Sequence, residues 1–135
     1  MVNNHSEQKQ RKPRMVINYK RLNELTVFYG YFLPNKVLHI NKTLNKWFSK
    51  FDCKFRFYQI RLKESAKPLT TFSTPQGQCI WNVMPMGLKN APQIFQRRMG
   101  SIFLECSDFC LIYVDDILTF SPNIADHAMH LMKFI

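Results

Sequence analysis

The chain has 135 residues, is 46% hydrophobic with 12 Phe, and carries a formal net charge of +10, which suits one folded domain and excludes a disordered chain. Fifteen of the 19 Lys and Arg lie within residues 1–67, which favours a polyanionic partner such as nucleic acid over the alternative of a solvated basic face. No apolar run reaches the roughly 18–20 residues that cross a bilayer, and the basic N-terminus lacks an apolar signal core, so we expect an intracellular protein.

The first half of the chain is predicted to contain short strands separated by irregular segments. Residues 1–13 are polar and charged and are predicted to be a loose basic segment. Gly30, Pro34 and several Asn predict an irregular loop. The remaining expected elements are a strand at 14–19, the loop at 20–36, a short helix within 37–47, a strand at 48–53 and an extended piece at 58–62.

The second half carries clearer signals. The turn sequence Pro75-Gln76-Gly77 predicts a hairpin, and Asn90 and Pro92 are typical of a helix start, as cap and first-turn residue. This mixture predicts an α+β fold with an antiparallel sheet. The expected elements are a hairpin at 69–73 and 78–84, a helix at 90–104, a strand–turn–strand unit at 109–120 and a helix from near 123.

Three acidic residues lie at the ends of apolar strands. Asp115 and Asp116 interrupt the apolar run 110–120, and Asp52 ends another such run. Buried carboxylates need a compensating partner such as a metal ion. The alternative to metal binding is a hairpin tip for Asp115 and Asp116 and a strand end for Asp52. Three carboxylates on neighbouring strands favour two Mg²⁺ ions, with Mn²⁺ as a substitute, because hard oxygen ligands suit these ions and two-metal sites serve nucleotidyl transfer.

The four cysteines form no CxxC pair and are predicted to be reduced, mostly buried thiols. Two of them and two downstream histidines match zinc ligands in residue type, but their spacing fits no common zinc module. These four residues are Cys106, Cys110, His127 and His130.

Four blocks of the chain resemble reverse transcriptases in order and spacing. The blocks are the Tyr-x-Asp-Asp box at 113–116, the block before it at 84–96, the block with the first acid at 47–52, and the fingers strand at 14–23. They are most similar to plant pararetroviruses of the caulimovirus type and next to long-terminal-repeat retrotransposons. The resemblance implies a polymerase palm-type antiparallel sheet packed on helices, with a partial fingers subdomain over 14–135 and no thumb.

The resemblance implies a role for each matching residue. Asp52, Asp115 and Asp116 would be the catalytic, metal-holding carboxylates, and the main-chain carbonyl of Cys53 would be a further ligand. Five residues would meet the nucleotide or the primer: Arg14 the triphosphate, Phe57 the ribose as a steric gate, Met86 and Gly87 the sugar and base, and Tyr113 the primer 3′ end. Three of these residues have a purely structural alternative: Arg14 as a solvated Arg at a strand edge, Phe57 as a core residue and Gly87 as a turn former. Three further basic residues would either contact template phosphate or simply carry surface charge. They are Lys89, Arg97 and Arg98.

The same resemblance implies partners and raises one doubt about activity. The implied partners are an RNA or DNA template with primer, deoxynucleotides, and the thumb and ribonuclease H domains of a parent polyprotein, in the cytoplasm, nucleus or virus-like particles and without a membrane. We expect the chain alone to be weakly active or inactive, because it stops shortly after the catalytic hairpin. Arg56 stands where the family has Gly, and a positive φ would strain it beside the metals. A catalytically inactive retroelement remnant that only binds nucleic acid is therefore the alternative.

Overall fold

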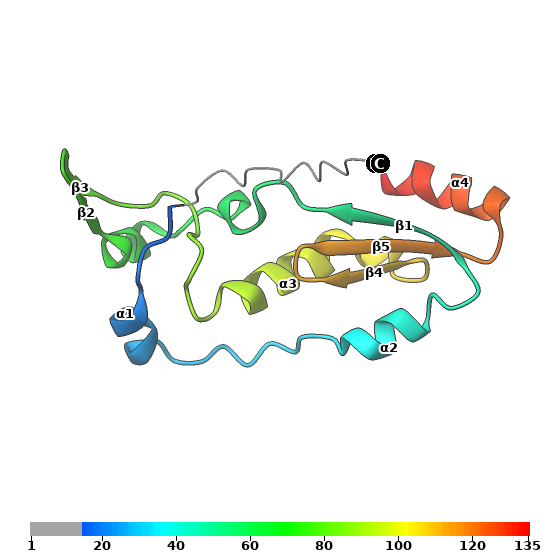
Figure 1. The fold of residues 1–135 in the computed structure, drawn as a ribbon, viewed down its shortest axis with the longest axis horizontal. Helices are drawn as coiled ribbons and strands as arrows, with labels where there is room; N and C mark the ends of the chain where they lie inside the picture. Colours follow the sequence, from blue (N-terminus) through cyan, green and yellow to red (C-terminus); the bar gives the residue numbers. More distant parts are fainter. Residues whose placement is uncertain (1–14) are drawn as a thin grey trace, which may run out of the picture.

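The computed structural model describes residues 15–135, so the predicted N-terminal segment and Arg14 lie outside the described residues. The described chain is elongated, with the hairpin of β2 and β3 at one end and the C-terminal helix α4 at the other (Figure 1). Its elements in chain order are α1 (Lys20–Leu25), α2 (Lys36–Asn41), β1 (Trp47–Asp52), the 3-10 helices η1 (Arg56–Gln59) and η2 (Glu64–Thr70), β2 (Phe72–Thr74), β3 (Gly77–Cys79), α3 (Ala91–Ile102), η3 (Leu104–Cys106), β4 (Cys110–Tyr113), β5 (Asp116–Ser121) and α4 (Ile124–Phe134).

The central sheet is antiparallel, with the strand order β1-β5-β4. In its register Phe51 lies opposite Ile117, which lies opposite Ile112. Residues that face each other across an antiparallel pair point to the same side, and neighbours along a strand point to opposite sides. The predicted α+β architecture is confirmed, and one sheet face is apolar while the other carries the acids.

Helices α3 and α4 cover the apolar face. Phe95 of α3 is 1% exposed and belongs to the same buried cluster as Ile112 and Ile117. Phe134 of α4 stacks on Phe51, with ring centroids 4.7 Å apart. Burying each aromatic ring stabilises the fold by roughly 2–3 kcal/mol. The sheet is therefore fixed from this side. Among the described residues, α2 covers part of the other side, where Ile40 lies near Leu111 and Leu118, and the end that carries the acids is more exposed.

Helix α4 begins where the sequence predicted. Asn123 caps it, because its side-chain oxygen accepts a hydrogen bond from the Asp126 backbone N–H at 2.8 Å. One turn later, buried His127 contacts the hydroxyls of Ser49 in β1 at 2.9 Å and Ser121 in β5 at 3.0 Å. These polar contacts join the helix to two strands and fix its position on the sheet.

The first 30 described residues depart most from the sequence predictions. Residues 15–19 form no strand, and the predicted loop at 20–36 begins with helix α1. Tertiary contacts position α1, because its Asn23 donates to the Gly87 carbonyl at 2.7 Å and accepts from the Lys89 N–H at 2.8 Å. The helix predicted within 37–47 is α2, which ends at Asn41.

The predicted hairpin around the Pro75-Gln76-Gly77 turn is confirmed, but its strands are shorter than expected. Residues 69–70 belong instead to η2. After β3 the chain turns inward, so that the Trp81 ring stacks on Tyr58 at 5.4 Å. Among the described residues, no helix is long and apolar enough to span a membrane.

The helix predicted at 90–104 is α3, and its predicted cap is wrong. Asn90 makes no side-chain capping bond. Its side chain instead donates to the Val27 carbonyl at 2.8 Å and accepts from the Tyr29 N–H at 3.0 Å. These tertiary hydrogen bonds replace the capping bond, because the Asn90 side chain joins the segment after α1 to the start of α3. Pro92 lies in the first turn as predicted.

Candidate active site

Strand register brings the three acids to one end of the sheet face opposite α3 and α4. Asp52 is the last residue of β1 and lies opposite Asp116, the first residue of β5. Asp115 occupies the turn just before, and its carbonyl accepts a hydrogen bond from the Cys53 N–H at 3.0 Å. Carboxylate oxygens of Asp52, Asp115 and Asp116 lie within 4.8 Å of one another. The prediction that these acids converge is confirmed, and we call them the carboxylate trio.

The turn that carries Asp115 is held from beneath by α3. Val114 has a φ of 54°, which is rare for a β-branched residue. The buried side chain of Gln96 accepts a hydrogen bond from the Val114 N–H at 2.6 Å and donates to the Ile112 carbonyl at 3.1 Å. Gln96 therefore fixes the hairpin tip and, with it, the position of Asp115.

The role of Gln96 was missed by sequence reasoning. It lies three residues before Met99, on the stripe of α3 that also buries Phe95. A polar side chain within an apolar helix stripe needs a buried hydrogen-bond partner, so its position was the available signal. Only the fold reveals that the partner is the hairpin turn.

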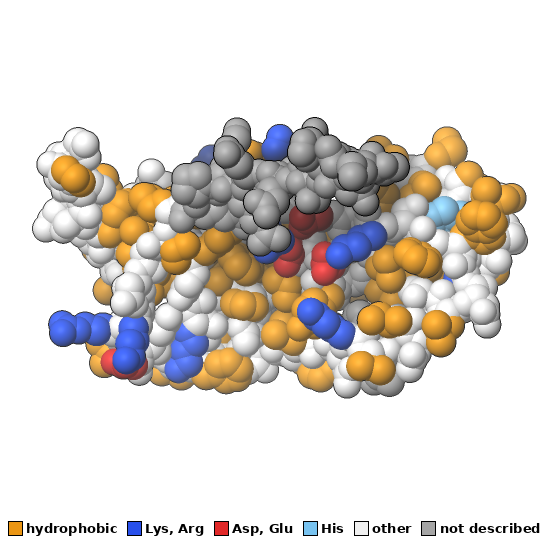
Figure 2. Space-filling model, in the orientation of Figure 1, with side chains coloured by type: hydrophobic (Ala, Val, Ile, Leu, Met, Phe, Trp, Pro, Cys, Tyr) orange, Lys and Arg blue, Asp and Glu red, His pale blue; other side chains and the backbone are white. Residues whose placement is uncertain are grey.

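Among residues 15–135, two basic side chains contact the carboxylate trio. The Arg56 Nε lies 2.7 Å from Asp115 Oδ2 and 3.9 Å from Asp52 Oδ1. The Lys50 Nζ lies 2.9 Å from Asp116 Oδ1, and this hydrogen bond, with the nearby negative charge, raises the pKa of Lys50. Acidic side chains gather near the centre of this face with basic side chains beside them (Figure 2). The local charge is therefore largely compensated within the chain.

The predicted strain at Arg56 is confirmed. Arg56 has a φ of 41°, and the preceding Phe55 has a φ of 63°. The Arg56 N–H donates to the Cys53 carbonyl at 3.3 Å, so the predicted carbonyl ligand already accepts one bond. Burial, followed by the negative charges of Asp115 and Asp52, raises the pKa of the Cys53 thiol.

The residues expected to meet nucleotide are separated by the fold. Met86 lines a cleft of about 410 Å³ together with Asp52 and Arg56. Phe57 is half-buried, and its ring packs edge-on against Phe95 with centroids 5.5 Å apart. Gly87, at a φ of 92°, lines a different groove. Met86 is thus close to the carboxylate trio, whereas Gly87 supports the contact with α1.

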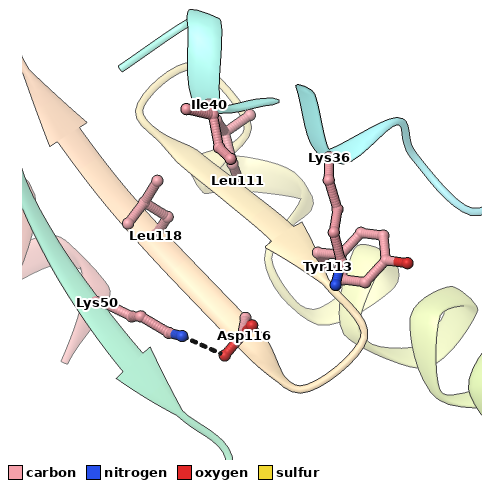
Figure 3. Close-up of a pocket in the computed structure, with 7 residues that line it drawn as sticks. All are labelled: Lys36, Ile40, Lys50, Leu111, Tyr113, Asp116 and Leu118. Atoms are coloured by element: carbon pink, nitrogen blue, oxygen red, sulfur yellow. Dashed lines mark ion pairs between the residues drawn. The ribbon is translucent and has the colours of Figure 1, made fainter. Parts of the chain in front are cut away.

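Tyr113 lies beside the carboxylate trio and below a basic side chain. It pairs with Asp116 across the hairpin, and the Lys36 Nζ lies 4.3 Å from the centre of its ring. A pocket of about 220 Å³ opens here, with Lys36, Lys50, Tyr113 and Asp116 around it (Figure 3). Its apolar wall is formed by Ile40, Leu111 and Leu118.

Three basic residues that were expected to meet template or solvent have different surroundings. The Lys89 Nζ donates to the Thr26 carbonyl at 2.9 Å, and the Arg97 guanidinium donates to the Tyr29 hydroxyl at 2.6 Å. Both therefore hold the segment that follows α1. Arg98 lines a groove with Arg61.

The zinc-like set of cysteines and histidines does not gather. Within residues 15–135, the carboxylate trio is the group of three or more such ligands that lies within metal-binding reach. His127 is bonded to serines, and the His130 ring stacks on Phe109 at 4.1 Å. All four cysteines are free, as predicted, but Cys79 is exposed.

Comparison with known proteins places the whole chain in one group. A family model described as reverse transcriptase (RNA-dependent DNA polymerase) matches residues 3–135. The enzymatic polyprotein of Cauliflower mosaic virus (strain Strasbourg) is 50% identical over 137 residues, covering 100% of this chain and 20% of that protein. The enzymatic polyprotein of Soybean chlorotic mottle virus is 48% identical over 136 residues, covering 99% and 20%. The chain thus spans about a fifth of these relatives.

Solved structures agree with this grouping. The foamy viral protease-reverse transcriptase in complex with an RNA/DNA hybrid has a TM-score of 0.80 and 22% identity, covering 90% of this chain and 16% of that one. The same protein with double-stranded DNA has a TM-score of 0.77 and 23% identity, covering 90% and 21%. At this identity the likeness concerns the fold, and it confirms the predicted palm and fingers arrangement.

Proposed function

This chain belongs to the reverse transcriptase family, and on that premise we propose that it supplies the metal-holding carboxylates of an RNA-directed DNA polymerase. The observation that carries the proposal is the carboxylate trio, whose oxygens lie within 4.8 Å of one another. Three separate positions in the sequence meet there, at the end of the sheet face opposite α3 and α4. Arg56 and Lys50 compensate part of this negative charge, and in our proposal metal ions and substrate would interact with the rest.

The trio fits divalent metal ions by its chemistry. All of its side-chain donors are carboxylate oxygens, the hard ligands that Mg²⁺ and Mn²⁺ prefer. In our proposal Asp52 and Asp115 hold the ions directly, while Asp116, which is paired with Lys50 at 2.9 Å, completes the negative field. Bound ions would lower the pKa of a primer 3′-hydroxyl and stabilise the leaving pyrophosphate.

The protein's own part in the reaction is positioning. Gln96 fixes the hairpin tip from beneath, so Asp115 needs little rearrangement to receive a cation. Tyr113 presents its ring beside Asp116, where we propose that it supports the primer end. Phosphoryl transfer needs little covalent chemistry from a protein, so such fixed positions account for much of the catalysis.

We assign the incoming deoxynucleotide to the cleft of about 410 Å³ next to Asp52. Met86 lines this cleft, and the neighbouring Phe57 is the proposed steric gate against a ribose 2′-hydroxyl. Phe57 packs edge-on against Phe95 of the core and is not among the residues that line the cleft, so its proposed role as a gate rests on the family resemblance. Arg14, which lies outside the described residues, remains the proposed contact for the triphosphate.

The proposed macromolecular partner is a primer–template duplex. The chain has a net charge of +10, and 15 of its basic residues lie in the first 67. The foamy viral structure with the same fold contains an RNA/DNA hybrid. Binding should therefore weaken with salt as displaced counterions compete for the phosphates. The other domains of the proposed parent polyprotein would correspond to the remaining length of the relatives, which this chain does not match.

A chimera tests the proposed activity within a longer protein. This chain replaces the matching segment of the Cauliflower mosaic virus polyprotein, to which it is 50% identical. We expect Mg²⁺-dependent extension of a DNA primer on an RNA template. Asp115→Asn should reduce extension at least about a hundredfold, because a charge-stabilising group is lost at the reacting centre. The exposed Asp108 gives the matched control Asp108→Asn, which should leave extension unchanged.

The chimera also tests the second candidate, an inactive remnant that only binds nucleic acid. Arg56 favours this candidate, because its guanidinium contacts two carboxylates of the trio. A remnant would bind duplex in a salt-dependent manner and give no extension above the Asp115→Asn background. Extension that is clearly above background and equal in the parent chimera and in Asp115→Asn would instead show that the trio takes no part in the reaction.

A further inference from the structure

Arg56 places one guanidinium between two acids from different strands. Its Nε lies 2.7 Å from Asp115 Oδ2, an ordinary distance for a charge-assisted hydrogen bond, and 3.9 Å from Asp52 Oδ1. Asp52 and Asp115 are the two acids proposed above to hold a cation directly. Arg56 therefore provides, from within the chain, the positive charge that a bound metal ion would otherwise supply.

The backbone directs Arg56 toward the trio. Phe55 and Arg56 have φ values of 63° and 41°, a left-handed conformation that favours glycine. The turn is closed on both sides, because the Arg56 N–H donates to the Cys53 carbonyl at 3.3 Å and the Tyr58 N–H donates to the Phe55 carbonyl at 2.9 Å. The side chain thus leaves a closed turn beside the acids, from a position where a glycine would present no side chain.

The charge balance favours competition with a metal ion. The three carboxylates carry three negative charges, and Arg56 and Lys50 neutralise two of them. Counting only these described groups, an entering divalent ion meets one net negative charge and a guanidinium in contact with its ligands. Arginine stays protonated at any ordinary pH, so its charge can leave only if the side chain moves. Metal binding must then break the contacts to Asp115 and Asp52.

The position of the side chain allows such a movement. The Arg56 side chain is 41% exposed and lines the cleft that also contains Met86, whereas the Asp115 side chain is 19% exposed. Because the guanidinium end of this pair is solvated, the pair contributes less to stability than a fully buried pair would when it is kept intact. The acid is fixed and the guanidinium is free to leave, so the balance between arginine and metal is set by Arg56.

We propose that Arg56 sets the divalent-cation affinity of the carboxylate trio, as a resident cation that a metal ion must displace. This inference rests on the proposed function, because it assumes that the trio holds metal. It predicts a site that binds Mn²⁺ or Mg²⁺ weakly with arginine at position 56 and more tightly with a neutral residue there. The effect of having arginine at position 56, where the family has glycine, would thus be weaker binding of a divalent cation.

Mn²⁺ titration of the full chain, followed by the electron paramagnetic resonance signal of free Mn²⁺, measures this affinity without catalysis. Arg56→Gln removes the charge while keeping a long side chain, and it should tighten Mn²⁺ binding by at least about tenfold, because a repulsive charge within about 5 Å is lost. Arg56→Lys should stay near the parent affinity. Arg56→Gly provides a second neutral variant that also suits the positive φ, should Arg56→Gln fold poorly by circular dichroism.

Lys54 supplies the matched control. It lies two residues earlier in the same turn, and its Nζ lies 5.2 Å from the centre of the Phe55 ring, outside the ion pairs of the trio. Lys54→Gln makes the same change in net charge and should leave Mn²⁺ affinity within about twofold, because an exposed charge at longer range is screened. Tightening equal to that of Arg56→Gln would reduce the effect to overall charge and overturn the proposal.

Asp115→Asn in each background separates the two levels of inference. If it abolishes Mn²⁺ binding in the parent and in Arg56→Gln, the trio is the metal site, and the ratio between these two proteins decides the role of Arg56. Equal affinity of parent and Arg56→Gln then overturns the role of Arg56 and leaves the proposed function standing. Mn²⁺ binding that survives Asp115→Asn in both backgrounds removes the metal from the trio and overturns both.

Discussion

The turn between β4 and β5 and the turn after β1 both place positive-φ residues beside a carboxylate, but they are supported in different ways. In the hairpin turn, Val114 has a φ of 54° and is held by two hydrogen bonds from the buried Gln96. In the turn after β1, Phe55 is 66% exposed and Arg56 is tied to the acids by an ion pair. The first turn is held by a buried side chain of α3, whereas the second is closed by its own backbone hydrogen bonds and by the ion pair of Arg56.

The two turns therefore have different roles in the site. Buried hydrogen bonds are costly to leave unmade, so the hairpin turn gives Asp115 a fixed position. An exposed ion pair contributes roughly 0–1 kcal/mol and exchanges readily, so the other turn can change its partner. We infer that the hairpin determines where a cation lies, whereas the turn after β1 determines which cation is there.

The largest expected effect comes from breaking the support of the hairpin turn. Gln96→Leu keeps the size of the side chain but leaves the Val114 N–H and the Ile112 carbonyl without partners. We expect a loss of about 3 kcal/mol in the free energy of unfolding, since each unsatisfied buried group costs about 1–3 kcal/mol. Urea unfolding followed by circular dichroism measures this loss.

The same helix offers a matched control for this substitution. Gln93 is also buried, at 8% exposed, and its side-chain oxygen has no hydrogen-bond partner among the described residues. Gln93→Leu should therefore be neutral or stabilising, because it removes a polar atom that is already unsatisfied. Equal losses for the two leucine variants would mean that Gln96 is ordinary packing and that the hairpin turn needs no support from α3.

The sequence alone located the trio because each acid interrupts an apolar run. Ionised side chains within β-prone segments are rare enough to mark strand ends that meet a cation, and the order of the four blocks identified the family. The predicted similarity to caulimovirus polyproteins is confirmed. The resemblance places a glycine at position 56 and so raised the expectation of a positive φ, and Arg56 has a φ of 41°.

What the sequence did not reveal depends on contacts between distant segments. Asn90 was expected to cap α3, yet its side chain bonds the segment that follows α1. Residues 20–36 were expected to be a loop because of Gly30, Pro34 and several Asn, yet helix α1 forms at the start of this segment, and none of its residues is buried. Gln96 gave a signal in its helix position, but its partner was invisible without the fold. Local patterns carry no information about such partners.

A thiol near each turn tests the difference in burial at alkaline pH. Cys110, in β4 of the hairpin, is 5% exposed, and burial raises its pKa to about 11. An unfolded thiol loses its proton near pH 8.5, so between roughly pH 9 and 11 the folded state holds the proton and the unfolded state does not. Stability must then fall as pH rises through this window.

Comparison of variants isolates this effect from other groups that titrate in the same range. Between pH 8 and 10.5, the parent should lose up to about 2 kcal/mol more stability than Cys110→Ala, which lacks the thiol. Cys53→Ala should change the slope less, because Cys53 is only half-buried. Urea midpoints at several pH values give the slopes. Parallel slopes for the parent and Cys110→Ala would show that the hairpin thiol is solvated.

The smallest effect is expected at Arg56, where strain and charge oppose each other. Arg56→Gly relieves a left-handed residue, worth about 1–2 kcal/mol, but it adds about 0.5–1 kcal/mol of unfolded-chain entropy and removes an exposed ion pair worth at most about 1 kcal/mol. We expect a change within about 1 kcal/mol at low salt. At 0.5 M salt the ion pair is screened, so Arg56→Gly should gain stability relative to the parent.

Val114→Gly is the counterpart in the hairpin turn and should behave in the opposite way. It relieves the same kind of strain, but Val114 is buried at 9% exposed and belongs to the core cluster, so the lost burial of about 2 kcal/mol outweighs the gain. Salt should leave this loss unchanged, because no charge is involved. If Val114→Gly and Arg56→Gly respond to salt alike, the hairpin turn is no more core-supported than the turn after β1. A salt response confined to Arg56→Gly would instead assign the hairpin turn to packing and the turn after β1 to the charge of Arg56.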